Sequence, residues 1–356
     1  MVVKTKTVLP RNRKSLHFHH KSFQRNDTNY YYYLLIMPAT TVLLPHQDTD
    51  KLFLTDGGLE TTLVFLEGFE LPHFAAIDML RTDKGQDWLR AYYRKYASMA
   101  QERGAGNVLE TVTWRSSAEW CDKIGYAPGT FEDINKQAVQ LCREIAAEYP
   151  NTPMVVSGCI GPRGDGYKPE ELMSADEAHK YHQTQVDVLA EAGVDVITAM
   201  TFNYIDEAIG ITRAAKTAGK PVVISFTVET DGCLPTGETL KEAIEQVDEA
   251  SDGVRPDYYM INCAHPTHFR SILVGQGDAA WALRIGGIRA NASKCSHAEL
   301  DECEELDDGN PVELGQEYRD ILPLLPMANV LGGCCGTDHR HIEQICHTCA
   351  PLFENK

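Results

Sequence analysis

From residue 51 onward, short apolar runs rich in β-branched residues alternate with longer stretches in which apolar positions recur at helical spacing. This alternation is typical of βα units, which build parallel sheets. Eight short runs predict strands: Leu52–Thr55, Val108–Glu110, Met154–Ser157, Val196–Ala199, Val222–Thr227, Tyr258–Asn262, Leu283–Gly287 and Asn329–Gly332. Helices are expected over Trp88–Arg103, Ile134–Tyr149, Ala175–Ala192, Ile205–Ala218, Leu240–Ser251 and His339–Cys346. Eight repeats in roughly 300 residues predict an α/β fold, a (β/α)8 TIM barrel that forms a single domain over residues 46–356.

Polar, glycine-rich or cysteine-containing segments follow seven of the eight predicted strands. They are Asp56–Gly58, Glu110–Trp114, Gly158–Pro162, Thr201–Asn203, Asn262–Cys263, Ala290–Asn291 and Gly333–Gly336. Barrel enzymes assemble their sites from the loops at the carboxyl ends of the strands. An open, doubly wound sheet would concentrate such residues only near its switch point. The distribution therefore favours a closed barrel with one functional rim.

The charge of the chain is unevenly distributed. The 356 residues carry a formal net charge of −18, but the first 36 residues contribute +6, which leaves −24 for the rest. A body this acidic would repel phosphate backbones and anionic lipid, so we expect small-molecule partners rather than nucleic acid or a membrane surface. Residues 1–45 are interpreted as a basic disordered extension or a targeting segment, and Met37 is an alternative start.

The cysteine content indicates a reducing compartment. Eleven cysteines are scattered through a long chain without a recognisable secretory signal, which argues against a disulfide framework. The apolar run Tyr30–Met37 is far shorter than the roughly 20 residues that a membrane helix needs. We therefore expect a cytoplasmic protein, or a mitochondrial or plastid one if residues 1–36 are a transit peptide.

Three cysteines form the most informative pattern. Cys334 and Cys335 lie among three glycines in the segment Gly332–Thr337, where tight turns let neighbouring thiols converge. Cys263 ends the sixth predicted strand, so a closed barrel would bring it to the same rim. Three thiolates with one open position suit a catalytic zinc ion, because structural zinc sites usually have four protein ligands. The competing interpretations are a four-thiolate site that includes Cys346 and Cys349, a vicinal disulfide, and buried structural thiols.

Such a zinc site favours one kind of chemistry. Three thiolates make zinc a poor Lewis acid for generating hydroxide, but coordination would still deprotonate an incoming thiol, which then accepts an alkyl group. The sequence thus predicts methyl transfer to a thiol, with Cys263, Cys334 and Cys335 acting through the metal. Two alternatives remain: a zinc hydrolase that uses His265 and His268, and a non-enzymatic thiol or metal sensor.

Several motifs together resemble the homocysteine S-methyltransferase family. They are Asp56-Gly57-Gly58, Ile261-Asn262-Cys263-Ala264, Asn291 in the segment RANAS, and the hexapeptide GGCCGT. The resemblance implies that the three cysteines bind Zn²⁺, that Asn291 completes the shell when substrate is absent, and that Asp56 holds the homocysteine amino group. It also implies that Gly57 and Gly58 let backbone amides approach the substrate carboxylate. The expected reaction forms methionine from homocysteine and S-methylmethionine, S-adenosylmethionine or betaine; the oligomeric state is left open.

One departure from the family pattern affects the acceptor. Many members have a glutamate after the fourth strand that binds the amino group, whereas this chain has Met200 there. Glu110 is the candidate replacement, and a different thiol or selenol acceptor is the alternative. Trp114, Phe202 and Tyr204 are candidates to hold a cationic donor by cation–π attraction, or else they are packing residues. The acidic segment Glu299–Asp308 is either a solvated face or a lid that attracts a cationic substrate.

Overall fold

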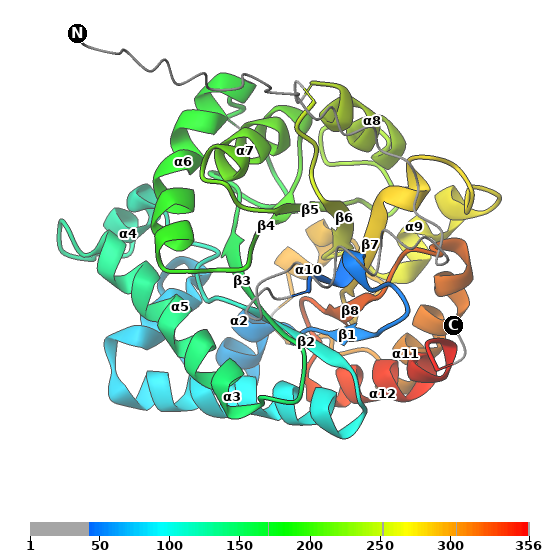
Figure 1. Ribbon diagram of the computed structural model, residues 1–356, viewed down its shortest axis with the longest axis horizontal. Helices are drawn as coiled ribbons and strands as arrows, with labels where there is room; N and C mark the ends of the chain where they lie inside the picture. The colour runs from blue at the N-terminus through cyan, green and yellow to red at the C-terminus, as the bar shows by residue number, and fades with distance from the viewer. Residues whose placement is uncertain (1–42, 170, 251–252, 304, 355–356) are drawn as a thin grey trace, which may run out of the picture. The chain divides into compact units, whose positions relative to one another are not determined.

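Eight parallel strands close into a barrel in chain order. The computed structural model describes residues 43–169, 171–250, 253–303 and 305–354. Each strand pairs with the next, and β8 pairs with β1 through Phe53–Val330 and Leu54–Leu331 (Figure 1). The strands are β1 (Phe53–Leu54), β2 (Gly106–Glu110), β3 (Met154–Ile160), β4 (Val196–Phe202), β5 (Val222–Thr227), β6 (Tyr258–Asn262), β7 (Ile285–Ala290) and β8 (Val330–Gly333). The prediction of a (β/α)8 barrel is confirmed.

Helices connect the strands and cover the outside of the barrel. The longer ones are α3 (Asp83–Glu102), α5 (Phe131–Glu148), α6 (Ala175–Glu191), α7 (Ile205–Thr217), α8 (Leu240–Ala250), α9 (Pro266–Leu273), α11 (Pro311–Ile321) and α12 (His339–Cys349). Shorter helices are α2 (Leu59–Thr61), α4 (Ala118–Lys123), α10 (His297–Asp301), η1 (Pro45–Gln47), η2 (Thr62–Leu66), η3 (Pro72–Phe74), η4 (Ala76–Arg81), η5 (Ala282–Arg284), η6 (Leu322–Leu324) and η7 (Ala350–Leu352). Most predicted boundaries hold within a few residues. The seventh strand begins two residues later and ends three residues later than predicted, and the later end includes Arg289.

The barrel interior changes from apolar to polar along the strands. Side chains alternate between the two faces of a strand, so every second residue points inward. One buried apolar cluster contains Leu44, Phe53, Val108, Val155, Val196, Val223, Tyr258, Met260 and Val330. Two residues further along five of these strands, the inward positions are buried and polar: Glu110, Ser157, Thr198, Ser225 and Asn262. The carboxyl ends of the strands thus form a polar floor above an apolar plug.

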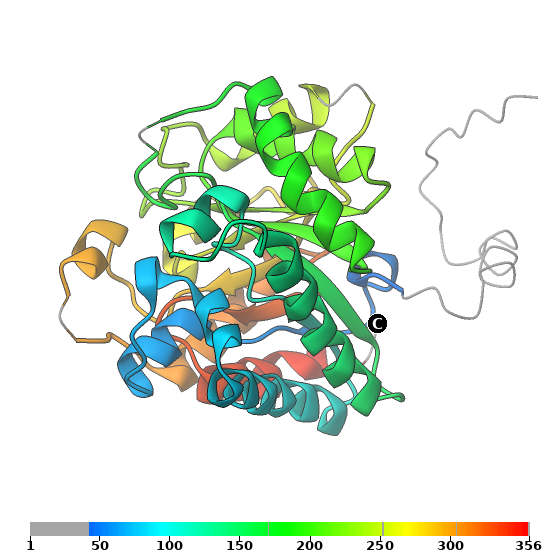
Figure 2. The same cartoon turned by 90° about the vertical axis from the view of Figure 1, so that its left-hand side faces the viewer.

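The two ends of the barrel are closed differently. At the amino ends of the strands, Asn329 Nδ2 donates to the Pro45 carbonyl at 2.8 Å, and Leu44 and Pro45 are buried, so ordered packing begins at least as early as Leu44. At the opposite end, α10 stands over the carboxyl ends of the strands (Figure 2). The predicted extension lies otherwise outside the described residues. The helix α10 begins the acidic segment, which places that segment at the functional rim.

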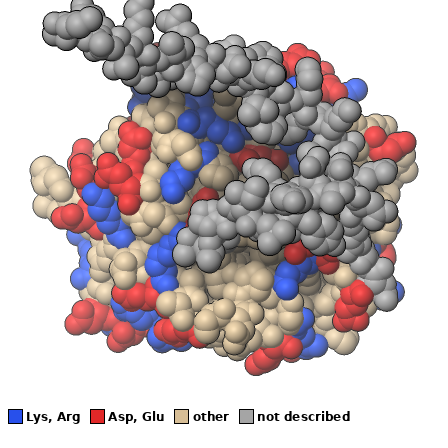
Figure 3. All heavy atoms as spheres, in the orientation of Figure 1, with Lys and Arg blue, Asp and Glu red and all other residues tan. Residues whose placement is uncertain are grey.

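Charged side chains of both signs are interspersed over the face that Figure 3 shows, around the residues drawn in grey. This face carries η1 and the amino ends of the strands (Figure 1). No large area of a single charge sign is visible on its described part (Figure 3). None of the helices in the described ranges combines the length and the apolar character needed to cross a bilayer.

Candidate active site

A pocket of about 420 Å³ opens at the carboxyl ends of the strands. Its lining comes from seven of the eight strand ends and from the loops that follow them. Among the predicted residues, the lining includes Asp56, Gly57, Gly58, Glu110, Asn291, Cys263, Cys334 and Cys335. The structure therefore brings together every residue that the sequence assigned to the metal or to the acceptor. It also adds Glu60, Arg115, Tyr167, Thr201 and Arg289, which the sequence reading did not assign to it.

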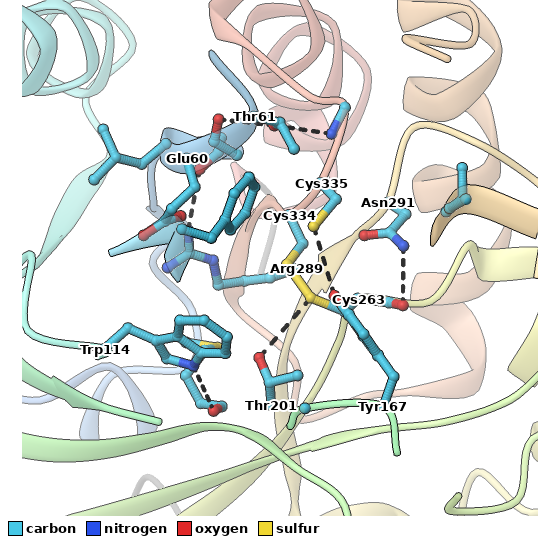
Figure 4. A pocket seen from close by; sticks show the side chains of 18 of the residues that line it. Glu60, Thr61, Trp114, Tyr167, Thr201, Cys263, Arg289, Asn291, Cys334 and Cys335 are labelled. Carbon is cyan, nitrogen blue, oxygen red and sulfur yellow. Dashed lines mark hydrogen bonds between the residues drawn. A yellow bond between two sulfur atoms is a disulfide. The ribbon is translucent and has the colours of Figure 1, made fainter. Parts of the chain in front are cut away.

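Three cysteine sulfurs meet in this pocket. The Sγ atoms of Cys263, Cys334 and Cys335 all lie within 4.8 Å of one another (Figure 4). Around a tetrahedral zinc with Zn–S bonds of about 2.3 Å, sulfurs would be about 3.8 Å apart, so the cluster is compact enough to hold this metal. Among the described residues, this cluster is where three or more His, Cys, Asp or Glu side chains lie close enough to share a metal ion. Cys346 and Cys349 are buried in α12 and are not part of it, so the four-thiolate alternative is wrong for this structure.

Two of the three sulfurs are covalently joined in the structure. Cys263 and Cys334 form a disulfide with their Cα atoms 5.3 Å apart, while Cys335 is a free thiol. The pairing thus links β6 to the turn after β8, and it is not the vicinal Cys334–Cys335 disulfide considered above. A cysteine in a disulfide cannot serve as a thiolate ligand. Metal binding by all three residues therefore belongs to the reduced protein.

Asn262 holds the strand ends around the cysteines. Its Nδ2 donates to Thr201 Oγ1 at 2.8 Å and to Cys263 Sγ at 3.2 Å, while its Oδ1 accepts from the Thr201 amide at 3.1 Å. Thr201 and Cys263 both have positive φ angles, 65° and 54°, which are uncommon for residues with a Cβ. Because such conformations persist only where the surroundings enforce them, the Asn262 contacts explain how the tips of β4 and β6 are kept in place.

Arg289 lies at the floor of the pocket beside two carboxylates. Its Nη2 lies 2.6 Å from Asp56 Oδ1, its Nε donates to the Gly333 carbonyl at 3.0 Å, and its Nη1 lies 3.9 Å from Glu110 Oε1. Burial opposes the charged guanidinium, but Asp56 and Glu110 outweigh burial and raise the pKa of Arg289. Burial also raises the pKa of Glu110 to about 7, although Arg289 acts in the opposite direction. The floor contains one ion pair and one further acid.

The glycines after β1 pack against the turn that carries the vicinal cysteines. The Gly58 amide donates to the Thr337 carbonyl at 2.9 Å and lies 3.2 Å from Thr337 Oγ1. A Cβ on Gly58 would come within 2.5 Å of the Cys334 carbonyl oxygen, and a Cβ on Gly57 within 2.8 Å of the Thr337 carbonyl oxygen. The glycines thus permit close approach of two backbones. The Gly58 amide is already used by this contact rather than left for a substrate.

Asn291 and the neighbouring loops surround the cysteines from the outer side. Asn291 Nδ2 donates to the Cys263 carbonyl at 3.0 Å, while its Oδ1 is buried without a hydrogen-bond partner in the described part of the chain. His297 Nε2 lies 2.6 Å from the same carbonyl. The Tyr167 hydroxyl lies 3.6 Å from Cys335 Sγ, and its ring packs on His297 with centroids 4.2 Å apart. These contacts close the site on the side of β7.

The aromatic candidates divide into one pocket residue and two packing residues. Trp114 lines the pocket, and its Nε1 donates to the Met200 carbonyl at 3.0 Å. The Arg115 guanidinium already lies over the Trp114 ring, 4.8 Å from its centroid. Phe202 is fully buried, and the Tyr204 hydroxyl accepts from the Met173 amide, so neither side chain is directed into the pocket.

The acidic segment contributes to the mouth of the pocket. Leu300, Asp301, Cys303, Glu305, Leu306 and Asp307 all line it. Asp307 is held by the Ser293 hydroxyl at 2.5 Å, and Asp301 pairs with Lys168 at 3.0 Å. Counting the whole lining, the acids are Asp56, Glu60, Glu110, Asp165, Asp301, Glu305 and Asp307, against two arginines, Arg115 and Arg289. Most acids of the segment are solvent-exposed, and six of its ten residues border the pocket, so the segment is both a solvated face and part of the pocket mouth.

Comparison with known proteins now identifies the chain's relatives. Residues 53–349 match the family model described as homocysteine S-methyltransferase. The chain belongs to the homocysteine S-methyltransferase family. The match spans all eight strands and all three clustered cysteines, so the resemblance predicted from the motifs is confirmed.

Individual relatives agree with the family assignment. Betaine–homocysteine S-methyltransferase 1 of Danio rerio is 30% identical over 259 residues, which cover 68% of this chain and 61% of that protein. The Bos taurus enzyme of the same name is 24% identical over 270 residues, covering 70% and 62%. This chain therefore spans about three-fifths of the length of these curated relatives. The metallated form of the homocysteine methyltransferase MmuM from Escherichia coli shares the fold, with a TM-score of 0.63 at 19% identity, covering 84% of this chain and 96% of that one.

Proposed function

We propose that this protein is a zinc-dependent S-methyltransferase that transfers a methyl group from a small onium donor to the thiol of homocysteine, giving methionine. The observation that carries the proposal is the convergence of Cys263, Cys334 and Cys335 in an open pocket of a homocysteine S-methyltransferase family barrel. In the transfer, a bond forms between the acceptor sulfur and the methyl carbon. The bond from that carbon to the onium atom breaks, and the donor leaves as a neutral thioether or amine.

The three cysteines would hold the metal, and a bound zinc ion would favour the thiolate form of an acceptor sulfur at neutral pH. Asn262 supports these ligands through its contact with Cys263 Sγ. Asn291 Oδ1 is buried and unpartnered in the described chain, which suits a further ligand when no acceptor is present. Asp56 Oδ1 pairs with Arg289 and its Oδ2 accepts from the Tyr92 hydroxyl at 3.1 Å. Asp56 would therefore orient Arg289, and any contact with the acceptor would be shared with that pair.

The charge of the pocket supports an onium donor. Seven acidic side chains against two arginines favour a cationic ligand and disfavour an anionic one. S-methylmethionine and S-adenosylmethionine carry a net positive charge, betaine is neutral overall, and methylated folates are anionic. We therefore rank the sulfonium donors above betaine and place folates last.

The hydrolase alternative finds no support in the positions of its histidines. His265 Nδ1 lies 2.8 Å from Thr267 Oγ1, and His268 Nε2 lies 2.9 Å from the Lys294 carbonyl. Both side chains are engaged in local contacts at the start of α9, and neither belongs to the cysteine cluster. No observation favours this second reaction over methyl transfer.

The decisive experiment uses the reduced, zinc-loaded protein, homocysteine labelled with carbon-13 in its carbon chain, and each of the three onium donors without label, so that labelled methionine can come only from homocysteine. Labelled methionine, detected by mass spectrometry, is expected from at least one donor with the wild type and not with Cys335→Ser. The absence of labelled methionine with all three donors would overturn the proposal. Methylation of a different thiol offered in parallel would support the alternative acceptor.

A further inference from the structure

Glu110 is a buried acid whose charge the fold does not use fully. It ends β2, is 6% exposed and lines the pocket. Its Oε1 lies 3.9 Å from Arg289 Nη1, too far for a hydrogen bond, and its Oε2 is buried without a hydrogen-bond partner among the described residues. A buried polar atom left without a partner is destabilising, and more so for a carboxylate. Glu110 therefore keeps the capacity for a partner beyond Arg289 and the nearby Ser157 hydroxyl, and it lines the pocket in which a ligand would lie.

The other acid on the floor is already committed. Both oxygens of Asp56 have partners, Arg289 at 2.6 Å and Tyr92 at 3.1 Å. The guanidinium neutralises Asp56, so the three side chains Asp56, Arg289 and Glu110 together keep one uncompensated negative charge when Glu110 is ionised. That charge resides on Glu110.

The tip of β4 provides no substitute. Met200 is 5% exposed, lines the pocket and has no charge, and its carbonyl accepts from Trp114 Nε1. The next residue, Thr201, has its hydroxyl bonded by Asn262. A cationic group of an acceptor on the cysteine side of the floor therefore meets Glu110 as its unsatisfied partner.

We propose that Glu110 determines the acceptor class: it receives the ammonium group of a thiol-bearing amino acid whose sulfur is held at the cysteine cluster. This inference rests on the proposed function, because it takes the cysteine cluster as the anchor for sulfur. It distinguishes amino thiols from simple thiols and relocates the recognition of the amino group from the fourth strand to the second. Arg289 acts here as a positioning residue that fixes Glu110 and Asp56 relative to each other.

The test compares two acceptors that differ only in the amino group, homocysteine and 4-mercaptobutanoic acid. Their dissociation constants are measured by calorimetry on the reduced, zinc-loaded protein, for the wild type, Glu110→Gln and Glu60→Gln. Glu60 is the matched control, because it is a second carboxylate in the same pocket whose pKa burial also raises to about 7. Zinc content is measured for each variant to show that the metal site is intact.

We expect the wild type to bind homocysteine about 10- to 100-fold more tightly than 4-mercaptobutanoic acid, as for a hydrogen bond to a charged group. Glu110→Gln should abolish this preference by weakening homocysteine binding alone, whereas Glu60→Gln should preserve it. If both variants lost the preference for homocysteine to the same extent, the cause would be the overall charge of the pocket, and the inference would be overturned. So would an unchanged preference in Glu110→Gln, or no preference in the wild type.

Binding and turnover separate this inference from the proposed function. A Glu110-dependent preference without any methionine from the donors would retain the acceptor site and refute the methyltransferase proposal. Methionine formation without the Glu110-dependent preference would do the opposite.

Discussion

Arg289 Nη2 lies 2.6 Å from Asp56 Oδ1, and both side chains are less than a tenth exposed. The pair joins residues 233 positions apart in the chain and connects β7 to the end of β1 across the floor of the barrel. The pair thereby neutralises one acid at the floor of the pocket and leaves the charge of Glu110 uncompensated.

This pair should be important for stability. Removing one partner of a buried ion pair leaves an uncompensated charge and typically costs about 3–5 kcal/mol. We expect Asp56→Asn and Arg289→Met each to lower the free energy of unfolding by about this amount, measured by denaturant titration of the reduced protein. The double variant should lose less than the sum, because the two changes remove one shared interaction.

The pair Arg94–Glu148, similarly close at 2.7 Å but about two-fifths exposed, is the control for that measurement. Glu148→Gln should cost less than about 1 kcal/mol, because solvent screens exposed pairs. Losses of similar size at the two sites would contradict the assignment of a special role to the buried pair.

Zinc content should depend on the three clustered cysteines and not on the two cysteines of α12. We expect about one zinc per chain in the reduced wild type, measured by atomic emission, and a large loss in Cys263→Ser, Cys334→Ser and Cys335→Ser. Cys346→Ser and Cys349→Ser are matched controls that should retain the metal. Full zinc occupancy in any of the first three variants would remove that residue from the metal site.

Asn262 should tune metal affinity without binding the metal itself. Its Nδ2 contacts Cys263 Sγ and also holds Thr201, so Asn262→Ala removes support from a ligand. Changes in such supporting groups commonly weaken metal affinity by about 10- to 100-fold. Competition with a chromogenic chelator measures the shift. Unaltered affinity would indicate that the hydrogen bond to sulfur is incidental.

The acidic segment should affect the donor rather than the acceptor. Asp301 and Glu305 line the mouth, while Glu302 lies in the same segment, is exposed and is absent from the lining. We expect Asp301→Asn and Glu305→Gln to raise KM for a sulfonium donor by about two- to fivefold each, an effect that salt weakens. Glu302→Gln serves as the matched control and should change KM less. A similar rise in all three variants would indicate a long-range field instead of a local contact.

Glu110 should make stability depend on pH in a defined direction. Its pKa is raised from 4.5 to about 7 on folding, so between these values the folded chain binds a proton that the unfolded chain releases. The contribution of Glu110 to stability therefore falls as pH rises from about 4.5 to 7. Relative to Glu110→Gln, which cannot ionise, the wild type should lose on the order of 3 kcal/mol between pH 5 and pH 8. Unfolding titrations of both proteins across this range test the sign, and a parallel course would refute it.

Local patterns in the sequence were sufficient for the architecture. Alternation of strand-like runs and helical periodicity predicted all eight strands. Each strand and helix buries a defined face, so the spacing of apolar residues within each segment already shows its type. The glycines around Cys334 and Cys335, with Cys263 at a strand end, likewise predicted the sulfur cluster. In each case the physical cause lies within a few residues of the signal.

Arg289 and Glu110 illustrate what only the closed barrel decided. An arginine within the seventh strand has no local feature that reveals its partner. The extension of β7 to Ala290 and the pairing of β8 with β1 bring Arg289 to Asp56, and they leave Glu110 Oε2 without a hydrogen-bond partner in the described chain. The sequence left two interpretations open for both Phe202 and the acidic segment. In the closed barrel, Phe202 is packed in the core and Glu305 borders the pocket. Which charges are paired and which remain for a ligand depends on distances between residues far apart in the chain, and these distances exist only once the barrel has closed.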